Sequence, residues 1–358
     1  MTRVYSRSEI IENLAVFKER LGQVKKVNKV WIFHHTDADG YCGGFICKNS
    51  AKDYDFETYA CDYSTDFSRY DIGRNDIVMV VDLSFTDKTI YHLKEMAYKC
   101  NDNIIWIDHH ESSLDCYNND EELRNIKFLS IALGSKQNKF SAAFLAYAVL
   151  QHNLTKFNDI LVEVPEFIYL VSDWDTWSHQ TKDSKYFNKA VNSTTDIYLY
   201  NKELSEYNEN NIWEQLYKEY ILDRGTLLED MINEARPLVK QTETLDARYL
   251  NSNGFEFNLF GYKVLACNQR NNSLLFGDKI NEYDFVCPFV LHERNGKLIY
   301  TYSLFSGTNQ NCKEIAERFG GGGHKGAAGF QLPFNIFTVK NLKFRLFLHN
   351  LKNKLTTK

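Results

Sequence analysis

The stretch Ile104-Ile105-Trp106-Ile107-Asp108-His109-His110 decides the fold, because a short apolar run is followed at once by three side chains of the types that bind metals. Buried parallel strands have short continuous apolar runs, and in open α/β sheets ligands bind beyond the carboxyl ends of the strands. The stretch therefore predicts a buried parallel strand that ends at a metal-centred active site.

Two earlier apolar runs end in the same way. Residues 30–33 lead into His34-His35-Thr36-Asp37-Ala38-Asp39-Gly40, and residues 77–81 lead into Asp82. We expect strands near 29–35, 56–60, 76–82 and 103–107, and the segments of helical length between them give the βαβ pattern of a parallel sheet. Three strand ends therefore bring carboxylates and imidazoles to one edge of the sheet.

The length of 358 residues exceeds the roughly 250–300 at which single hydrophobic cores stop growing, so we expect two domains. The predicted fold class is α/β. A parallel-sheet domain at 1–198 is joined by a helical linker at 199–250, amphipathic and rich in charges, to a smaller α/β domain at 251–358 that carries a glycine-rich loop.

The net charge, the cysteines and the lengths of the apolar segments exclude some classes of function. A net charge of −5 argues against sequence-independent binding of long duplexes, which needs many Lys and Arg, but is compatible with a short phosphorylated ligand. Eight scattered cysteines without a Cys-x-x-Cys pair predict reduced, mostly buried thiols in a cytoplasmic protein. No apolar segment has the length of a membrane span, so we expect no membrane partner.

The first motif offers a compact set of metal ligands. His35, Asp37 and Asp39 alternate, and in an extended segment residues two apart project to one side. Imidazole and oxygen ligands without a thiolate suit Mn²⁺ or Mg²⁺ and argue against a structural zinc site. Manganese is the first choice and magnesium the alternative, because imidazole is poorly matched to magnesium.

Asp82 stands alone at its strand end, where one carboxylate could bridge two cations with one oxygen for each. A bridge sets the metals about 3.5–4 Å apart, and such a pair activates a shared water for in-line displacement at phosphorus. The pattern thus indicates hydrolysis of a phosphate ester. The last ligand should come from residues 171–177, where Asp173 and Asp175 are both candidates.

Each motif also has a purely structural explanation. A strand-terminal aspartate is more often a helix N-cap than a ligand. The histidine pair could be a buried polar pair, and Gly320–Gly323 could belong to a flexible linker. The joint occurrence of three motifs after three apolar runs favours the metal site. Likewise, His324-Lys325 and the small residues that follow favour a loop whose exposed N–H groups bind an anion.

Taken together, the motifs resemble the DHH phosphoesterase superfamily, which is named for the triplet at residues 108–110. The string Gly321-Gly322-Gly323-His324, followed by Ala-Ala-Gly at 327–329, resembles the DHH-associated domain of that superfamily. Residues 35–40, the Asp-Thr-Trp at 175–177 and the whole glycine string are most similar to oligoribonucleases of the nanoRNase B type.

The resemblance implies roles for individual residues. One Mn²⁺ would be held by His35, Asp37 and Asp82, and a second by Asp39, Asp82, His109 and Asp175. His110 would lie beside the scissile phosphate, and the substrate would be held by Gly321, Gly322, Gly323 and His324. Asp175 is preferred to Asp173 because the Asp-Thr-Trp form matches the closest branch. Phe305 stands where many members carry an arginine, which implies a base-stacking or a packing role there, and packing is preferred.

We therefore expect a cytoplasmic, Mn²⁺-dependent phosphodiesterase that hydrolyses short single-stranded oligoribonucleotides from one end to nucleoside monophosphates, with His110 and Asp82 as catalytic residues. A homodimer is compatible with the sequence. Two alternatives are a phosphodiesterase for cyclic dinucleotides and a phosphatase for 3′-phosphoadenosine 5′-phosphate. An alternative of another class is a non-catalytic scaffold that binds nucleic acid, although such a scaffold should have lost some of the mutually repelling ligands.

Overall fold

The computed structural model describes residues 26–63, 65–86, 89–126, 129–131, 140–150, 164–193, 211–269, 273–294, 296–323 and 325–339. The chain divides into two compact units, one up to Pro237 and one from Leu238 onward, and each is described by itself. The domain boundaries at residues 198 and 250 stay predictions.

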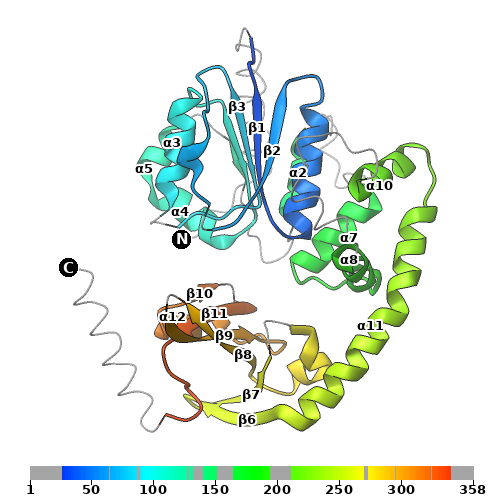
Figure 1. Ribbon diagram of the computed structural model, residues 1–358, viewed down its shortest axis with the longest axis vertical. Helices are drawn as coiled ribbons and strands as arrows, with labels where there is room; N and C mark the ends of the chain where they lie inside the picture. The colour runs from blue at the N-terminus through cyan, green and yellow to red at the C-terminus, as the bar shows by residue number, and fades with distance from the viewer. Residues whose placement is uncertain are drawn as a thin grey trace. The chain divides into compact units, whose positions relative to one another are not determined.

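The first unit is built on a five-stranded sheet in the order β2-β1-β3-β4-β5, of which Figure 1 labels β2, β1 and β3. All neighbouring strands are parallel, so the predicted parallel sheet is confirmed. The strands are β1 (Val30–His35), β2 (Phe56–Cys61), β3 (Ile77–Val81), β4 (Ile104–Ile107) and β5 (Leu129–Ile131).

Helices cover both faces of this sheet, because successive residues of the apolar strands point to opposite sides. Ile32, Met79 and Ile105 belong to the core on one face, and Phe33 and Trp106 belong to the core on the other. The first core packs against α2 (Ala38–Ser50), α6 (Ala142–Leu150), α7 (Glu166–Asp175) and α8 (Asp183–Ser193). The second packs against η1 (Phe67–Arg69), α3 (Ile90–Lys99), α4 (Glu111–Asn119) and α5 (Glu121–Asn125).

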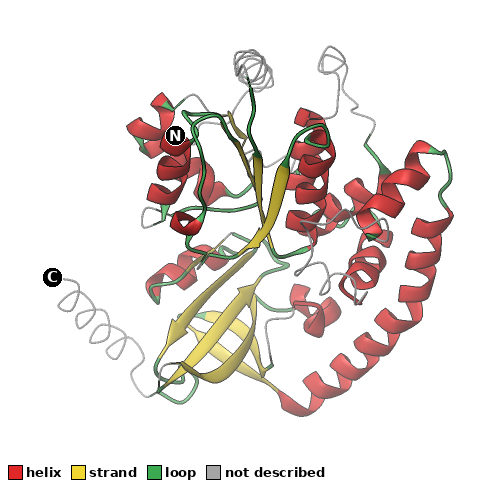
Figure 2. Ribbon diagram, turned by 45° about the horizontal axis from the view of Figure 1, so that its top comes forward, coloured by secondary structure: helices red, strands yellow, loops and turns green. Residues whose placement is uncertain are grey.

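Two helices occupy most of the described part of the predicted linker. In α10 (Ile212–Ile221), Trp213 and Leu216 are buried in the first of these cores. The long helix α11 (Thr226–Asn253) contains Pro237 and leads directly into the strands of the second unit, as seen in Figure 2. Its Ile232 packs in the core of the first unit, and its Leu250 packs in the second unit.

The second unit contains a six-stranded sheet in the order β10-β11-β9-β8-β7-β6. Only β7 and β8 run parallel among its described pairs. Phe305 is partly buried against the core that includes Leu250, which is a packing role. The elements are β6 (Gly254–Leu259), β7 (Tyr262–Asn268), η3 (Ser273–Asn281), β8 (Phe285–Arg294), β9 (Lys297–Phe305), α12 (Cys312–Arg318), β10 (Gly322–Gly323) and β11 (Ala327–Leu332).

Two expectations from composition can be compared with this structure. All eight cysteines are free and buried, as predicted for reduced thiols. Among the described residues, no helix combines the length and the apolar character needed to cross a bilayer.

Candidate metal centre

The carboxyl ends of three neighbouring strands bring the predicted ligands together. In the parallel register His34 of β1 lies opposite Val81 of β3, and Val81 lies opposite Ile107 of β4. The backbone N–H of Asp82 continues this ladder by donating to the carbonyl of Ile107 at 2.9 Å. The segments after β1, β3 and β4 therefore start side by side at one edge of the sheet.

The segment after β1 turns sharply into α2. Asp37 caps this helix, since its Oδ1 accepts from the N–H of Gly40 at 3.0 Å, while its Oδ2 lies 2.8 Å from Nδ1 of His35. A Cβ atom at position 40 would lie 2.3 Å from the carbonyl oxygen of His35, so this tight return of the chain requires glycine. The N-cap explanation for an aspartate thus holds for one oxygen of Asp37, and the other oxygen faces His35.

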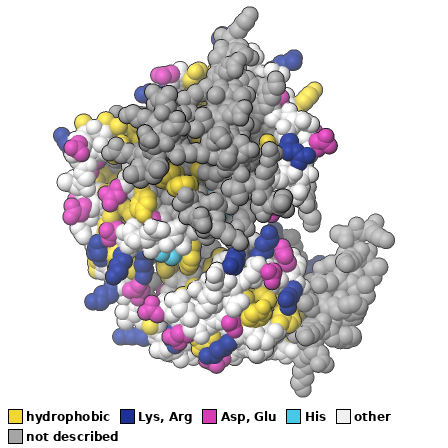
Figure 3. Space-filling view, turned by 180° about the vertical axis from the view of Figure 1, so that it is seen from behind, with side chains coloured by type: hydrophobic (Ala, Val, Ile, Leu, Met, Phe, Trp, Pro, Cys, Tyr) yellow, Lys and Arg dark blue, Asp and Glu magenta, His cyan; other side chains and the backbone are white. Residues whose placement is uncertain are grey.

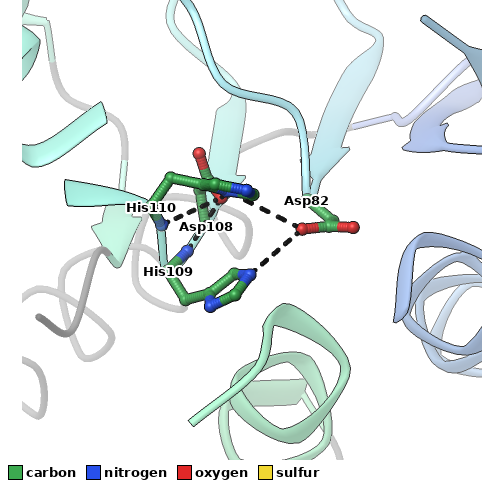
Figure 4. A group of neighbouring side chains, drawn as sticks. All are labelled: Asp82, Asp108, His109 and His110. Atoms are coloured by element: carbon green, nitrogen blue, oxygen red, sulfur yellow. Dashed lines mark hydrogen bonds and ion pairs between the residues drawn. The ribbon is translucent and has the colours of Figure 1, made fainter. Parts of the chain in front are cut away.

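Asp82 lies between two groups of predicted ligands. Its Oδ2 is 3.7 Å from Nδ1 of His35, and its Oδ1 is 3.4 Å from Nε2 of His109. The residue is only 1% exposed, and Oδ1 has no hydrogen-bond donor among the described residues. Its backbone has a φ of 58°, in the left-handed region where a non-glycine residue is strained. Figure 4 shows this carboxylate beside both His109 and His110.

The second group gathers around His109. Its Nε2 lies 3.1 Å from Oδ2 of Asp175 and 3.8 Å from Oδ2 of Asp39. Asp39, in the first turn of α2, also accepts from the first two backbone N–H groups of α6, those of Ala142 at 2.8 Å and Ala143 at 2.9 Å. The positive end of the α6 dipole therefore stabilises this buried carboxylate.

Of the two candidates in α7, the structure places Asp175 and not Asp173 beside His109. Asp173 is 3% exposed and accepts from the backbone N–H groups of Gln180 and Thr181 at 2.7 and 3.3 Å. It therefore holds the turn that follows the helix, whereas Asp175 at the last position of α7 faces the centre.

Asp108 acts on the backbone and on His110. Its Oδ1 accepts from the N–H of His109 at 2.8 Å and lies 2.7 Å from Nδ1 of His110. Its Oδ2 accepts from the hydroxyl of Ser84 at 3.1 Å and from that of Ser113. The first residue of the triplet thus fixes the orientation of the third, whose Nδ1 is 3.9 Å from Asp82 Oδ1.

Crowding of carboxylates changes their protonation. Burial, together with the charges of Asp82 and Asp175, raises the pKa of Asp39 well above its usual range. Burial and the charge of Asp37 raise the pKa of Asp82 to about 6. In both cases the cause is the cost of ionising an acid near other acids in a buried place, a cost that a bound cation removes.

The pKa values of three histidines at the centre are also raised, although burial acts on them in the opposite direction. Burial lowers their pKa, but carboxylates outweigh it: Asp37 and Asp82 raise the pKa of His35 to about 11, and Asp108 raises that of His110 to about 9. The pKa of His109 is raised well above its usual range by Asp175 in the same way. In the absence of a metal, the positive charge of the protonated imidazoles therefore offsets the negative charge of the carboxylates.

The donor atoms of these residues fit divalent cations. Two groups of donors, each within 4.8 Å of one another, are formed by His35, Asp37 and Asp82 and by Asp39, His109 and Asp175. A third such group joins Asp82 to the residues of the triplet. Carboxylate and imidazole donors without sulfur suit Mn²⁺ or Mg²⁺. Asp82 belongs to two of the three groups, and its buried Oδ1 has no hydrogen-bond partner among the described residues.

Several residues of this centre were not predicted from the sequence. Ser84 and Ser113 hold Asp108, and the amino end of α6 holds Asp39, through contacts that no motif indicates. Tyr63, which follows β2, places its ring 5.3 Å from the ring of His35. It could have been found, because β2 ends at the same edge of the sheet as β1.

The glycine-rich segment forms a hairpin rather than an open loop. Gly322 and Gly323 of β10 pair with Gly329 and Ala328 of β11, and small side chains permit that close pairing. Gly323 has a φ of 139°, which L side chains rarely adopt, whereas a Cβ at Gly322 would meet nothing within 4 Å. Gly321 donates its N–H to the carbonyl of Ala316 at 3.0 Å. His324 lies outside the described residues.

No model of a protein family matches the chain, and no curated protein matches it. Among solved structures, a DHH domain described as belonging to a family of ribosomal proteins is similar at 14% identity, over 98% of this chain and 93% of that chain, with a TM-score of 0.55. Exonuclease RecJ bound to manganese matches at 14% identity, over 94% of this chain and 93% of that chain, with a TM-score of 0.46. The pGpG-specific phosphodiesterase PggH from Vibrio cholerae matches at 15% identity, over 86% of this chain and 93% of that chain, with a TM-score of 0.45. The chain therefore has the fold of a DHH-domain protein.

Proposed function

We propose that this protein is a phosphodiesterase that uses two Mn²⁺ ions to hydrolyse short oligoribonucleotides to nucleoside monophosphates. One observation carries the proposal: the buried carboxylate of Asp82 has His35 beside one oxygen and His109 beside the other, and the second oxygen has no hydrogen-bond donor in the described part of the chain. A carboxylate in that situation is suited to bridging two cations.

The proposed ligands are those that the sequence predicts. His35, Asp37 and Asp82 would hold one ion, and Asp39, Asp82, His109 and Asp175 the other. When bound, the ions would lower the pKa of water and neutralise the charge that develops on the phosphoryl group. The chain itself supplies the rigid frame: α6 holds Asp39, the α2 N-terminus holds Asp37, and the end of β3 holds Asp82.

His110 is the proposed contact to the scissile phosphate. Asp108 holds its ring through Nδ1, and Asp108 is held in turn by two serine hydroxyls. An imidazolium anchored in this way can donate a hydrogen bond to a phosphoryl oxygen or a proton to the leaving oxygen. Asp108 is thereby proposed as a positioning residue and not as a ligand.

The second unit is proposed to hold the rest of the substrate on its glycine hairpin. The open space around the Cα of Gly322 would let a ligand approach the backbone there. Gly321, Gly322, Gly323 and His324 are the proposed residues. The preference for short RNA over other phosphodiesters rests on the resemblance of these motifs to the nanoRNase B type.

Surface charge supports a short substrate rather than a long duplex. On the face shown in Figure 3, the described Lys and Arg side chains lie interspersed with Asp and Glu side chains. Duplex binding that is independent of sequence needs many cations that follow the phosphates.

The test is a rate comparison at saturating Mn²⁺ on 5′-labelled RNAs of two to ten nucleotides, cyclic dinucleotides and 3′-phosphoadenosine 5′-phosphate. We expect the fastest cleavage for the shortest RNAs. A faster rate on a cyclic dinucleotide or on 3′-phosphoadenosine 5′-phosphate would reassign the substrate.

The matched controls are chelation of the metal and the Asp82→Asn variant, both of which should abolish turnover. No turnover by the wild type on any substrate, together with no manganese uptake, would favour the non-catalytic scaffold. Full activity of Asp82→Asn with full metal content would contradict the bridging role.

A further inference from the structure

Tyr63 follows the fourth strand end that reaches the candidate centre. It lies two residues beyond Cys61, the last residue of β2, and Cys61 is opposite His35 in the parallel register. The phenol ring lies 5.3 Å from the imidazole of His35, with an angle of 43° between the planes, while 59% of the residue is exposed. One side of this ring therefore contacts a candidate ligand, and water reaches the rest.

The turn that carries Tyr63 does not depend on the phenol. Asp62 and Thr65 close it: the N–H of Thr65 donates to the carbonyl of Asp62 at 3.1 Å, and the N–H of Asp62 donates to the hydroxyl of Thr65 at 2.9 Å. Within the described residues, no hydrogen bond of the Tyr63 hydroxyl is found. The hydroxyl is therefore not needed to hold the local fold.

The chemistry of the phenol suits a site that gathers carboxylates. An ordinary tyrosine keeps its proton at neutral pH, so its hydroxyl is a neutral donor. A neutral donor adds no negative charge beside the carboxylates of the centre.

We propose that Tyr63 contacts the substrate, with its hydroxyl donating a hydrogen bond to a phosphoryl oxygen of the phosphodiester. This rests on the proposed function, because it places a phosphate at the centre. Hydrogen bonds from a neutral donor to an anionic oxygen are stronger than those between neutral groups. The contact with His35 holds the ring so that little conformational freedom is lost when the phosphate binds.

Two other roles for the same ring lead to different results. The ring could stack on a nucleobase, which needs the aromatic face and not the hydroxyl. It could instead hold His35 in place, which would make it a positioning residue for the metal. Tyr63→Phe removes only the hydroxyl, and Tyr63→Ala removes the ring as well, so the pair of variants separates these roles.

The experiment measures three quantities on the full chain: Mn²⁺ affinity, affinity of the manganese-loaded protein for inorganic phosphate, and kcat/KM on a dinucleotide. Tyr54→Phe is the matched control, because Tyr54 is 49% exposed and precedes β2 at the opposite edge of the sheet. For Tyr63→Phe we expect unchanged Mn²⁺ affinity, and phosphate affinity and kcat/KM each lower by about tenfold, the size of one hydrogen bond to a charged group. Tyr54→Phe should equal the wild type.

Each outcome decides the proposal. If Tyr63→Phe has the phosphate affinity and the kcat/KM of the wild type, the proposal is overturned. If only Tyr63→Ala loses kcat/KM, the ring stacks on a nucleobase. If the Mn²⁺ affinity of Tyr63→Ala falls as well, the ring holds His35 in place. If the wild type cleaves no phosphodiester but phosphate binding still needs the hydroxyl, the proposed function fails and the Tyr63 contact stands. No phosphate binding by the loaded wild type would overturn both.

Discussion

The two ends of strand β3 carry the same residue type in opposite situations. At the amino end Asp76 is 5% exposed, and its Oδ2 accepts from the indole N–H of Trp31 and from the backbone N–H of Gly73, both at 2.7 Å. At the carboxyl end Asp82 is 1% exposed, its Oδ1 has no donor among the described residues, and its φ is 58°. A buried carboxylate that accepts two short hydrogen bonds stabilises a fold. One that lies on strained backbone, with its nearest histidine nitrogens 3.4 and 3.7 Å away, costs stability.

The same contrast extends along the two edges of the sheet. At the amino edge Lys29 pairs with Glu57, so opposite charges are matched locally. At the carboxyl edge, burial and then repulsion by Asp37 raise the pKa of Asp82 to about 6. One edge is therefore arranged for stability, and the other gathers buried carboxylates whose charges are balanced only by protons on the neighbouring histidines or by a bound cation.

The largest expected effect comes from changing the two aspartates of β3 separately. Asp82→Asn should lower kcat on a dinucleotide by about 10²- to 10³-fold or more, because transition-state charge loses its stabilisation. The metal-free variant should melt at a higher temperature than the wild type above pH 6. Since the raised pKa makes the ionised form of Asp82 unfavourable in the fold, the gain should grow as pH rises through about 6 and vanish near pH 4.

Asp76→Asn is the matched control and should do the reverse. It should lower the free energy of unfolding by about 1–3 kcal/mol, because one partner of a buried hydrogen-bond pair is changed. Its kcat should stay within about twofold of the wild type, since a residue at the amino edge does not touch the reacting atoms. Thermal melts and initial rates should be measured on both variants, and similar results for the two would contradict the different roles of Asp76 and Asp82.

Helix α7 shows the same contrast between two aspartates, Asp173 and Asp175. Asp175→Asn should lower the manganese content of the protein, with little change in the melting temperature of the metal-free form. Asp173→Asn should lower that temperature by several degrees, because two backbone N–H groups lose a charged acceptor. Metal analysis and calorimetry check both, and an exchange of the two phenotypes would make Asp173 the ligand.

A smaller effect concerns pH and the Asp108–His110 pair. The pKa of His110 is raised to about 9, so the stability that its protonated ring contributes is complete below its ordinary pKa near 6.5 and is lost as pH rises through 9. In chelator, His110→Gln should therefore melt several degrees below the wild type at pH 6 and approach it at pH 10. A difference in melting temperature that is constant across this range would contradict the assignment of the pair.

The smallest effect is expected at the amino edge. Lys29→Met removes the partner of Glu57, and about a third of each of these side chains is exposed. Such pairs contribute about 0–1 kcal/mol and weaken with salt. The variant should therefore lose at most about 1 kcal/mol of stability at low ionic strength, less at 1 M salt, and no activity. A clear drop in kcat would show that the two edges are not separate in function.

The strands of the first sheet and the residues at its carboxyl edge can largely be predicted from the sequence, because the patterns that specify them are local. The apolar runs fix β1, β3 and β4 to within one residue at either end, because buried parallel strands need such runs. The parallel register then places the residues that follow these strands at one edge of the sheet. Two groups of side chains lie close enough there to bind a cation: His35, Asp37 and Asp82, and Asp39, His109 and Asp175. Their roles as ligands stay predictions.

Contacts between distant segments could not be predicted. The carboxylate of Asp39 accepts from Ala142 and Ala143, and nothing in either segment specifies the other. The choice between Asp173 and Asp175 depends on the direction in which the end of α7 points. The glycine string predicts close backbone approach, yet the pairing of Gly323 with Ala328 as a short hairpin depends on the whole second sheet.

The bonds between Asp39 and α6 also constrain the order in which the protein can be assembled during its synthesis. They join residues 103 and 104 positions apart, so at about 5–20 residues per second the carboxylate is made several seconds before the helix that donates to it exists. Asp175 is synthesised later still. A nascent chain that ends before α6 therefore lacks the means to fix Asp39, and the set of proposed ligands is complete only after most of the first unit has been synthesised.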